Sequence, residues 1–253
     1  MRLVPLGIGS SFSAAPMGWY SNLVDGKLLV DAAPQAVLQL RRLGVAADDL
    51  EAVAITHLHG DHVFGFPFLL AERSPELEPI PVVGPEGTGK RLAQLCSLAF
   101  SVADPAKMVP IELPPGRKSE AAVGDYRLLA APTEHTPDSL GYLITGPEGT
   151  RLACSGDAAW CDGLRLLLSD ADAALVEMTF IKVGKADHLS LAEHLPKIVA
   201  AVPAAAPILL THLSQPRREY LDALRRLRRG LPADEARLLD RVEPAEELRE
   251  YVF

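Results

Sequence analysis

Short apolar segments, separated by polar and turn-rich stretches, recur along most of the chain. Segments that favour strands occupy residues 1–7, 27–31, 52–55, 80–83, 108–113, 126–130, 140–145, 151–155, 174–176 and 208–211. Apolar residues at helical spacing predict helices over residues 34–43 and 62–73, from about residue 90 to residue 100, and over residues 190–200. The stretches 14–22 and 114–125 are rich in turn-forming residues and predict loops. The pattern predicts a chain in which strands and helices are mixed throughout.

Four of the predicted strands lead into a residue of a type that binds metals. His57 follows the strand at 52–55, and the strands further along the chain lead to His135, Asp157 and His212. Binding sites are commonly built on loops that a rigid scaffold holds at one edge of a sheet. We therefore expect these four side chains to converge.

The densest group of such residues is the segment Thr-His-Leu-His-Gly-Asp-His, in which three histidines and one aspartate lie within six residues. In an extended chain His57 and His59 point to the same side. Gly60 lets the backbone turn, so that Asp61 and His62 aim at a different point. A single histidine near a strand end is usually a hydrogen-bonded surface or core residue, but four ligand-type residues at this spacing indicate metal binding. The spacing predicts two neighbouring metal positions.

The composition is that of a globular protein with a sizeable core. Apolar residues make up 48% of the 253 residues, and 25 basic against 33 acidic residues give a net charge of −8, which does not favour nucleic-acid binding. Three cysteines without a C-x-x-C spacing (Cys96, Cys154 and Cys161) fit a reducing compartment. The N-terminus lacks an unbroken apolar signal core, and the apolar run at 198–210 is too short to span a membrane. We expect a cytoplasmic protein in which residues 1–253 form a single domain.

Three stretches allow a second interpretation. The segment 84–90 is rich in glycine, but the lysine at its end is not followed by serine or threonine, so a turn and helix start is a better account than a phosphate loop. The arginines between Arg217 and Arg229 could bind RNA phosphates, but such a run of charged residues more often forms the solvent-exposed face of a helix. Trp19 and Tyr20 could line a substrate mouth or cap the core.

The spacing His-x-His-x-Asp-His after a strand resembles the signature of the metallo-β-lactamase superfamily, and residues 7–12 resemble the start of its ribonuclease Z branch. The resemblance implies an α/β fold, a four-layer αββα sandwich of the metallo-β-lactamase type. It also implies that one metal is bound by His57, His59 and His135 and a second by Asp61, His62 and His212, with Asp157 as the bridge. Nitrogen and oxygen ligands without thiolate suit two zinc ions, with manganese or iron as alternatives.

The resemblance also implies roles for residues around the metals. Two metal ions can activate water at neutral pH and hold the oxygens of a displacement at phosphorus, and Asp61 would orient that water or accept its proton. His188 and Glu177 occupy positions at which ribonuclease Z enzymes have a proton-donating histidine and a glutamate that orients it. Val176 departs from that branch, which commonly has histidine there. The alternative is that Glu177 and His188 form a carboxylate–histidine pair that only supports the metal ligands.

The length of one connection bears on the substrate. Ribonuclease Z enzymes usually insert a flexible, basic arm between the residues that correspond to His135 and Asp157. Only 21 residues separate these two positions here, with one hairpin around residues 146–149, so an arm does not fit. Cyclic phosphodiesterases of the same branch lack the arm, and the negative net charge agrees with a small substrate. We expect a metal-dependent hydrolase that acts on small or cyclic phosphodiesters.

Other functions are compatible with the same residues. An endonuclease that processes tRNA 3′ ends is the second choice, with nucleic acid as its partner, and a homodimer fits either function. A metal centre of this kind also hydrolyses lactones, thioesters and organophosphates, because a fold does not fix one function. A flavin-partnered di-iron oxidoreductase is disfavoured because His59 stands where that branch has glutamate. A metal-binding module without catalysis is disfavoured because the ligand set is complete.

Overall fold

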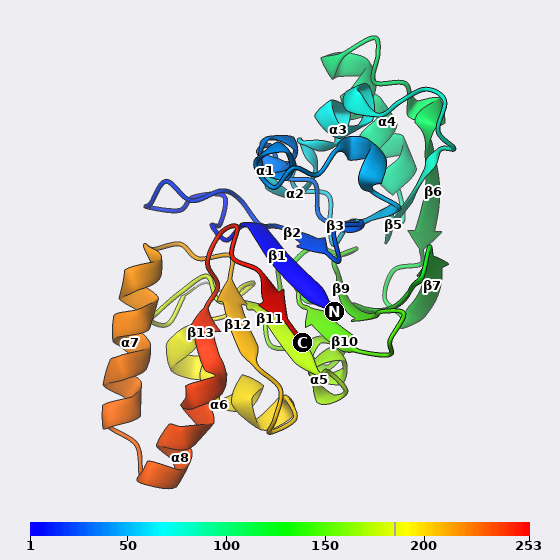
Figure 1. The fold of residues 1–253 in the computed structure, drawn as a ribbon. Coiled ribbons are helices and arrows are strands. Elements are labelled where there is room, and N and C mark those ends of the chain that lie inside the picture. Colours follow the sequence, from blue (N-terminus) through cyan, green and yellow to red (C-terminus); the bar gives the residue numbers. More distant parts are fainter. Residues whose placement is uncertain (185) are drawn as a thin grey trace.

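The computed structural model describes residues 1–184 and 186–253 and contains two β-sheets that pack face to face (Figure 1). Each sheet has seven strands, in the order β14-β1-β2-β3-β4-β5-β6 and β13-β12-β11-β10-β9-β8-β7. Buried side chains of both sheets, among them Val30 and Ala54 of one and Leu128 and Tyr142 of the other, form one core. Helices cover the outer faces, which gives the predicted four-layer αββα sandwich.

The first sheet carries the predicted metal motif at the end of one of its parallel strands. Its strands are β1 (Arg2–Gly7), β2 (Ser21–Val24), β3 (Leu28–Val30), β4 (Ala52–Ala54), β5 (Ile80–Pro85), β6 (Met108–Leu113) and β14 (Tyr251–Val252). Strands β3 to β6 run parallel, whereas β14, β1, β2 and β3 pair antiparallel. A second apolar cluster packs this sheet against α1 (Ala36–Arg42), α2 (Gly60–Val63), α3 (Phe66–Glu72) and α4 (Thr88–Ala99).

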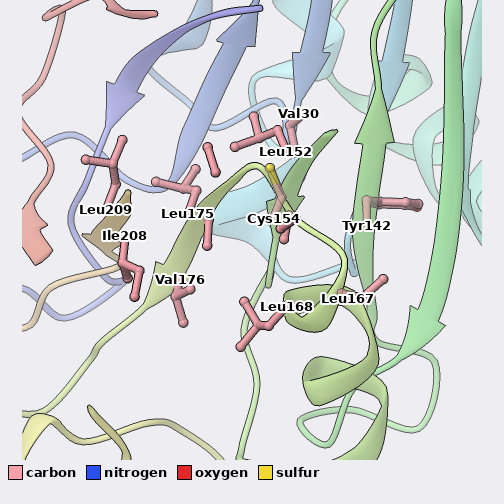
Figure 2. Close-up of a cluster of buried hydrophobic side chains, with 14 of the residues drawn as sticks. Val30, Tyr142, Leu152, Cys154, Leu167, Leu168, Leu175, Val176, Ile208 and Leu209 are labelled. Carbon is pink, nitrogen blue, oxygen red and sulfur yellow. The ribbon is translucent and has the colours of Figure 1, made fainter. Parts of the chain in front are cut away.

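The second sheet supplies the remaining strand ends. Its strands are β7 (Ser119–Val123), β8 (Tyr126–Pro132), β9 (Leu140–Thr145), β10 (Arg151–Cys154), β11 (Ala173–Glu177), β12 (Ile208–Thr211) and β13 (Val242–Pro244). Strands β10 to β13 are parallel. The helices on this side are α5 (Asp162–Ser169), α6 (Leu191–Ala201), α7 (Arg217–Arg229) and α8 (Ala233–Leu238). Leu175 and Val176 are neighbours on β11 and point to opposite faces (Figure 2), so both faces of this strand are apolar and buried.

The expected strands and helices are present; helix α8 and strands β13 and β14 were not predicted, and four further local predictions were wrong or incomplete. Strand β7 lies in the stretch expected to be a loop; it pairs with β8 at the sheet edge, where its alternate residues face solvent. Strand β2 begins at Ser21, inside the loop expected up to residue 22. Helix α5 was not predicted. The helix expected over 62–73 is two helices, because the amide of Gly65 donates to the carbonyl of Ala32 at 2.8 Å and Pro67, in the first turn of α3, has no amide hydrogen.

The glycine-rich segment before α4 forms a turn and a helix start, as expected. Gly87 has a positive φ of 89°, which favours glycine. The amides of Gly87 and Gly89 donate to the carboxylate of Glu112 at 3.1 and 2.9 Å. Because the chain's own carboxylate occupies this helix start, the segment is not arranged to hold a phosphate. Among the described residues, no helix is long and apolar enough to cross a membrane.

Candidate metal centre

The structure brings all seven predicted metal ligands into one cluster between the ends of the two sheets. Within it, ligand atoms lie less than 4.8 Å from one another in three overlapping groups: His57, His59 and His135; His57, His62 and Asp157; and Asp61, His62 and His212. The first and third of these groups have the same members as the two predicted ligand sets. Their side chains come from segments up to 155 residues apart (57 to 212), which only the packing of the two sheets brings together.

The first group surrounds one point from three directions. His57 follows β4 and is buried, His59 precedes α2, and His135 follows β8. The ring of His57 lies 4.6 Å from that of His59 and 5.0 Å from that of His135, centroid to centroid. His135 Nε2 lies 3.2 Å from His59 Nδ1. Three ring nitrogens this close are arranged as ligands of a single cation.

The second group is built around the start of α2. Asp61 and His62 lie on its first turn, and His212 follows β12 in a left-handed conformation with φ of 54°. Asp61 Oδ2 lies 3.5 Å from His62 Nε2 and 3.9 Å from His212 Nε2. The residues on either side of Gly60 thus face different points, as the spacing predicted.

Asp157 lies between the two groups, directly after β10 and almost fully buried. Its carboxylate oxygens lie close to the Nε2 atoms of four histidines: His212 at 3.2 Å, His62 at 3.5 Å, His135 at 3.7 Å and His57 at 3.8 Å. One carboxylate thus contacts both groups, which is the position expected for a bridging ligand.

The outer ring nitrogens are held by hydrogen bonds that fix the tautomers. His62 Nδ1 donates to Asp31 at 2.7 Å. Thr179 Oγ1 donates to Glu177, so it accepts from His212 Nδ1 at 2.8 Å. In the same way, Thr56 Oγ1 donates to Asp31 and therefore accepts from His57 Nδ1 at 3.1 Å. The carbonyl of Asp187 accepts from His135 Nδ1 at 3.2 Å. Four rings therefore turn Nε2 toward the centre of the cluster.

The inner atoms show that the cluster fits a metal. The Nε2 atoms of His57, His62 and His212 and the Oδ1 atom of Asp157 are buried and have no hydrogen-bond partner among the described residues. Buried polar atoms without partners are costly and rare. Metal-binding histidines typically donate one nitrogen to the protein and direct the other to the metal. The residues present therefore match the donor set of a divalent transition metal.

The charges of the cluster hold Asp157 and His57 in the forms that bind metals. Burial alone would raise the pKa of Asp157, but the neighbouring His212 and His62 outweigh it and hold that pKa well below its usual range. Burial, with the charge on His62, lowers the pKa of His57 far below its usual value. Asp157 is therefore ionised and His57 is neutral, the forms in which both bind metals.

Sequence reasoning had not assigned Asp31 to the site. Its side chain is fully buried at the end of β3, and it accepts from Thr56 N, Thr56 Oγ1 and His62 Nδ1, each at 2.7 Å. Burial raises the pKa of Asp31, whereas His62 opposes this shift. Burial by itself would lower the pKa of His62, but the charges of Asp157 and Asp31 outweigh the effect of burial and raise that pKa. An acidic residue directly after an apolar strand was the only signal in the sequence.

Glu177 and His188 form a pair beside the cluster. Glu177 is fully buried and accepts from His188 Nδ1 at 2.7 Å, from Ala158 N at 3.1 Å, and from Thr179 N and Oγ1 at 2.9 and 2.8 Å. Burial lowers the pKa of His188, but the contact with Glu177 outweighs it and raises that pKa. The His188 ring stacks on that of His212 at 5.4 Å.

The rim of the cluster includes a residue that sequence reasoning missed. Ser11 Oγ donates to Asp61 Oδ2 at 2.7 Å, and the carbonyl of Ser11 accepts from Trp19 Nε1 at 3.3 Å. Trp19 is 37% exposed, whereas Tyr20 is fully buried with its ring 5.4 Å from that of His62. Of the two alternatives for these aromatics, Trp19 lies at the rim and Tyr20 in the core. His194 lies outside the cluster, and its Nδ1 accepts from Ser190 N at 3.0 Å.

Comparisons with known proteins agree with this geometry. Residues 27–213 match the family described as "Beta-lactamase superfamily domain". A ribonuclease Z of Methanosarcina mazei is 31% identical over 162 residues, which are 60% of this chain and 50% of that protein, so the match spans only half the length of that relative. The predicted family is confirmed, and the predicted hydrolase class agrees with it.

Two solved structures share the fold over nearly their whole length. One is a diphosphatase of the PhnP family, with a TM-score of 0.75 and 19% identity over 100% of this chain and 97% of that one. The other is the short form of human tRNase Z, with a TM-score of 0.72 and 20% identity over 100% and 99% of the two chains. At this level of identity the two structures establish the fold alone.

We expect Asp31→Ala to lower the free energy of unfolding of metal-free protein by about 3–5 kcal/mol, because it leaves a buried histidine and a buried threonine without their acceptor. Urea unfolding in the presence of a chelator measures the change. Asp125→Ala, which alters an exposed aspartate, should change the same free energy by less than about 0.5 kcal/mol. Equal effects of the two substitutions would show that the Asp31 contacts do not stabilise the site.

Proposed function

The chain belongs to the beta-lactamase superfamily, and we propose that it is a metal-dependent hydrolase with two zinc ions that cleaves small or cyclic phosphodiesters. The observation that carries the proposal is the set of inward-facing buried donors around Asp157 that have no partner among the described residues. Each donor is a nitrogen or a carboxylate oxygen, which suits zinc and admits manganese or iron. Two such ions would polarise the phosphoryl oxygens and lower the pKa of water.

The proposed ligand sets follow the two groups in the cluster. His57, His59 and His135 would hold one ion, Asp61, His62 and His212 the other, and Asp157 would contact both. Asp61 would also orient the attacking water or accept its proton, and Ser11 holds its Oδ2 atom in place.

His188 is the proposed donor of the proton that the leaving oxygen needs. Glu177 accepts the hydrogen on Nδ1, so the Nε2 hydrogen of the charged ring remains available to a substrate. The raised pKa of His188 favours this charged form. Glu177 itself would act by positioning His188, because its four hydrogen bonds leave it no role as a proton acceptor.

Two features support a small substrate. The 21 residues between His135 and Asp157 contain β9, the turn that follows it and β10, so no arm extends from the sandwich here. Several arginines of α7 are engaged within the chain: Arg217 with Glu243 and Glu246, Arg225 with Asp222, and Arg228 with Asp240. The helix therefore offers fewer charges to a polyanion than its sequence suggests.

The second candidate is endonucleolytic processing of tRNA. It is favoured by the similarity to a protein named ribonuclease Z and by the likeness to human tRNase Z. The same metal ligands and the same His188 would serve that reaction, so the two candidates differ in substrate binding rather than in chemistry.

Purified protein reconstituted with zinc should hold two ions per chain, measured by equilibrium dialysis and mass spectrometry of the metals. Asp157→Ala should lose both, because the residue contacts both ligand groups. His194→Ala, which removes a histidine outside the cluster, should keep both ions. Wild-type protein that binds no zinc or manganese would contradict the proposal.

His188→Ala should lower kcat for the hydrolysis of a cyclic nucleotide by about 10²–10⁴-fold, because the leaving group of that substrate is a poorly stabilised alkoxide. Hydrolysis of bis(p-nitrophenyl) phosphate should suffer much less, because nitrophenolate leaves without a proton. Zinc content, measured alongside, separates a proton donor from a residue that supports the metal site. Equal losses on both substrates would exclude the role of proton donor.

Turnover of a small phosphodiester should depend weakly on ionic strength, and a tRNA precursor should bind poorly at physiological salt. Combined reversal of three exposed arginines, Arg218→Glu, Arg225→Glu and Arg229→Glu, should leave small-substrate kcat/KM nearly unchanged. Filter binding and steady-state kinetics at several salt concentrations measure both quantities. Tight, salt-sensitive tRNA binding that this variant loses would favour the endonuclease.

A further inference from the structure

A cavity of about 500 Å³ lies next to the candidate metal centre, between the segment after β11 and helix α7. Residues 180–183 form one wall, Ser214 and Gln215 lie beside them, and Glu219, Asp222 and Arg226 of α7 form the other wall. A volume in the range of about 300–1,000 Å³ is typical of sites for small molecules. None of these residues belongs to the proposed metal or proton-transfer machinery.

The cavity adjoins the side of the centre on which His188 lies. The ring of Phe180 stands edge-on to that of His188, with the centroids 6.2 Å apart. Ser214 Oγ donates to the carbonyl of Thr179, whose hydroxyl contacts His212. If His188 protonates the leaving oxygen, the group attached to that oxygen extends toward Phe180.

The lining combines an aromatic face with hydrogen-bonding groups. Gly184 packs closely against Phe180, because a Cβ atom on Gly184 would lie 1.9 Å from the ring. The side chain of Gln215 forms no hydrogen bond with a described residue, and both Gln215 and Phe180 are partly exposed. An aromatic ring beside a free amide suits a planar heterocycle, which stacks on the ring and forms hydrogen bonds with the amide at its edge.

The charges of the lining argue against a chain of phosphates. Lys182 and Arg226 form no ion pair with a described residue, but the carboxylates of Glu219 and Asp222 line the same cavity, on the same helix as Arg226. Two basic and two acidic residues leave little net charge. A site for a second phosphate would need an excess of cations.

We infer that this cavity binds the nucleoside on the leaving side of the scissile phosphodiester, with the base stacked on Phe180 and bonded to Gln215. The inference rests on the proposed function and names its substrate class. It makes Phe180 and Gln215 residues that set specificity, separate from those that carry out the reaction.

Binding of adenosine to metal-free protein, followed by ligand-observed NMR and calorimetry, tests the inference without catalysis. Wild-type protein should bind adenosine but neither ribose nor inorganic phosphate. Phe180→Leu should weaken adenosine binding about tenfold or more, because a stacked base is lost, and Phe180→Tyr should retain it. Phe68→Leu is the matched control: Phe68 is a half-exposed phenylalanine on α3, packed edge-on against Phe100, and its loss should leave adenosine binding unchanged.

The outcomes separate this inference from the proposed function. Absence of adenosine binding by wild-type protein, equal losses in Phe180→Leu and Phe68→Leu, or binding of phosphate that depends on Arg226 would each overturn the nucleoside site. Zinc-loaded wild-type and Phe68→Leu proteins should hydrolyse bis(p-nitrophenyl) phosphate with the same kcat, because Phe68 lies outside both the metal centre and the cavity. If neither cleaves it while adenosine still binds as described, the phosphodiesterase proposal fails and the nucleoside site stands.

Discussion

The buried carboxylate of Asp31 connects the scaffold to the metal motif. It receives hydrogen bonds from the end of β4, through Thr56, and from the first turn of α2, through His62. An ionised carboxylate without solvent exposure is costly unless such donors surround it. The same contact directs His62 Nε2 toward Asp157, so the interaction that stabilises this corner of the fold also positions a donor.

Both sheets are needed to complete the centre. The first sheet contributes the motif residues from His57 to His62, and the second contributes His135, Asp157 and His212. The apolar contacts between the sheets therefore also hold together a group of partly charged residues that would otherwise separate. Binding of metal ions would favour the packed state by mass action, which links the stability of the sandwich to the proposed activity.

The sequence was most informative where local patterns dominate. Strand ends followed by histidine or aspartate predicted the cluster because strands that run in the same direction end at the same edge of a sheet. Asp31 was missed as a site residue because its role depends on hydrogen bonds to segments distant in sequence. Strand β7 was missed because an edge strand exposes alternate polar residues, which resembles a loop in the sequence. The break at Gly65 involves a hydrogen bond to Ala32, which is distant in sequence, but Pro67 was a local signal for the start of a new helix.

The most direct test of the account is a crystal structure of zinc-loaded protein with anomalous scattering recorded at the zinc absorption edge. The account predicts two anomalous peaks, one among His57, His59 and His135 and the other among Asp61, His62 and His212, with Asp157 in contact with both. The histidine rings should keep their Nδ1 contacts with Asp31 and Thr179. Zinc bound elsewhere, or a cluster without zinc at saturating concentration, would contradict the account.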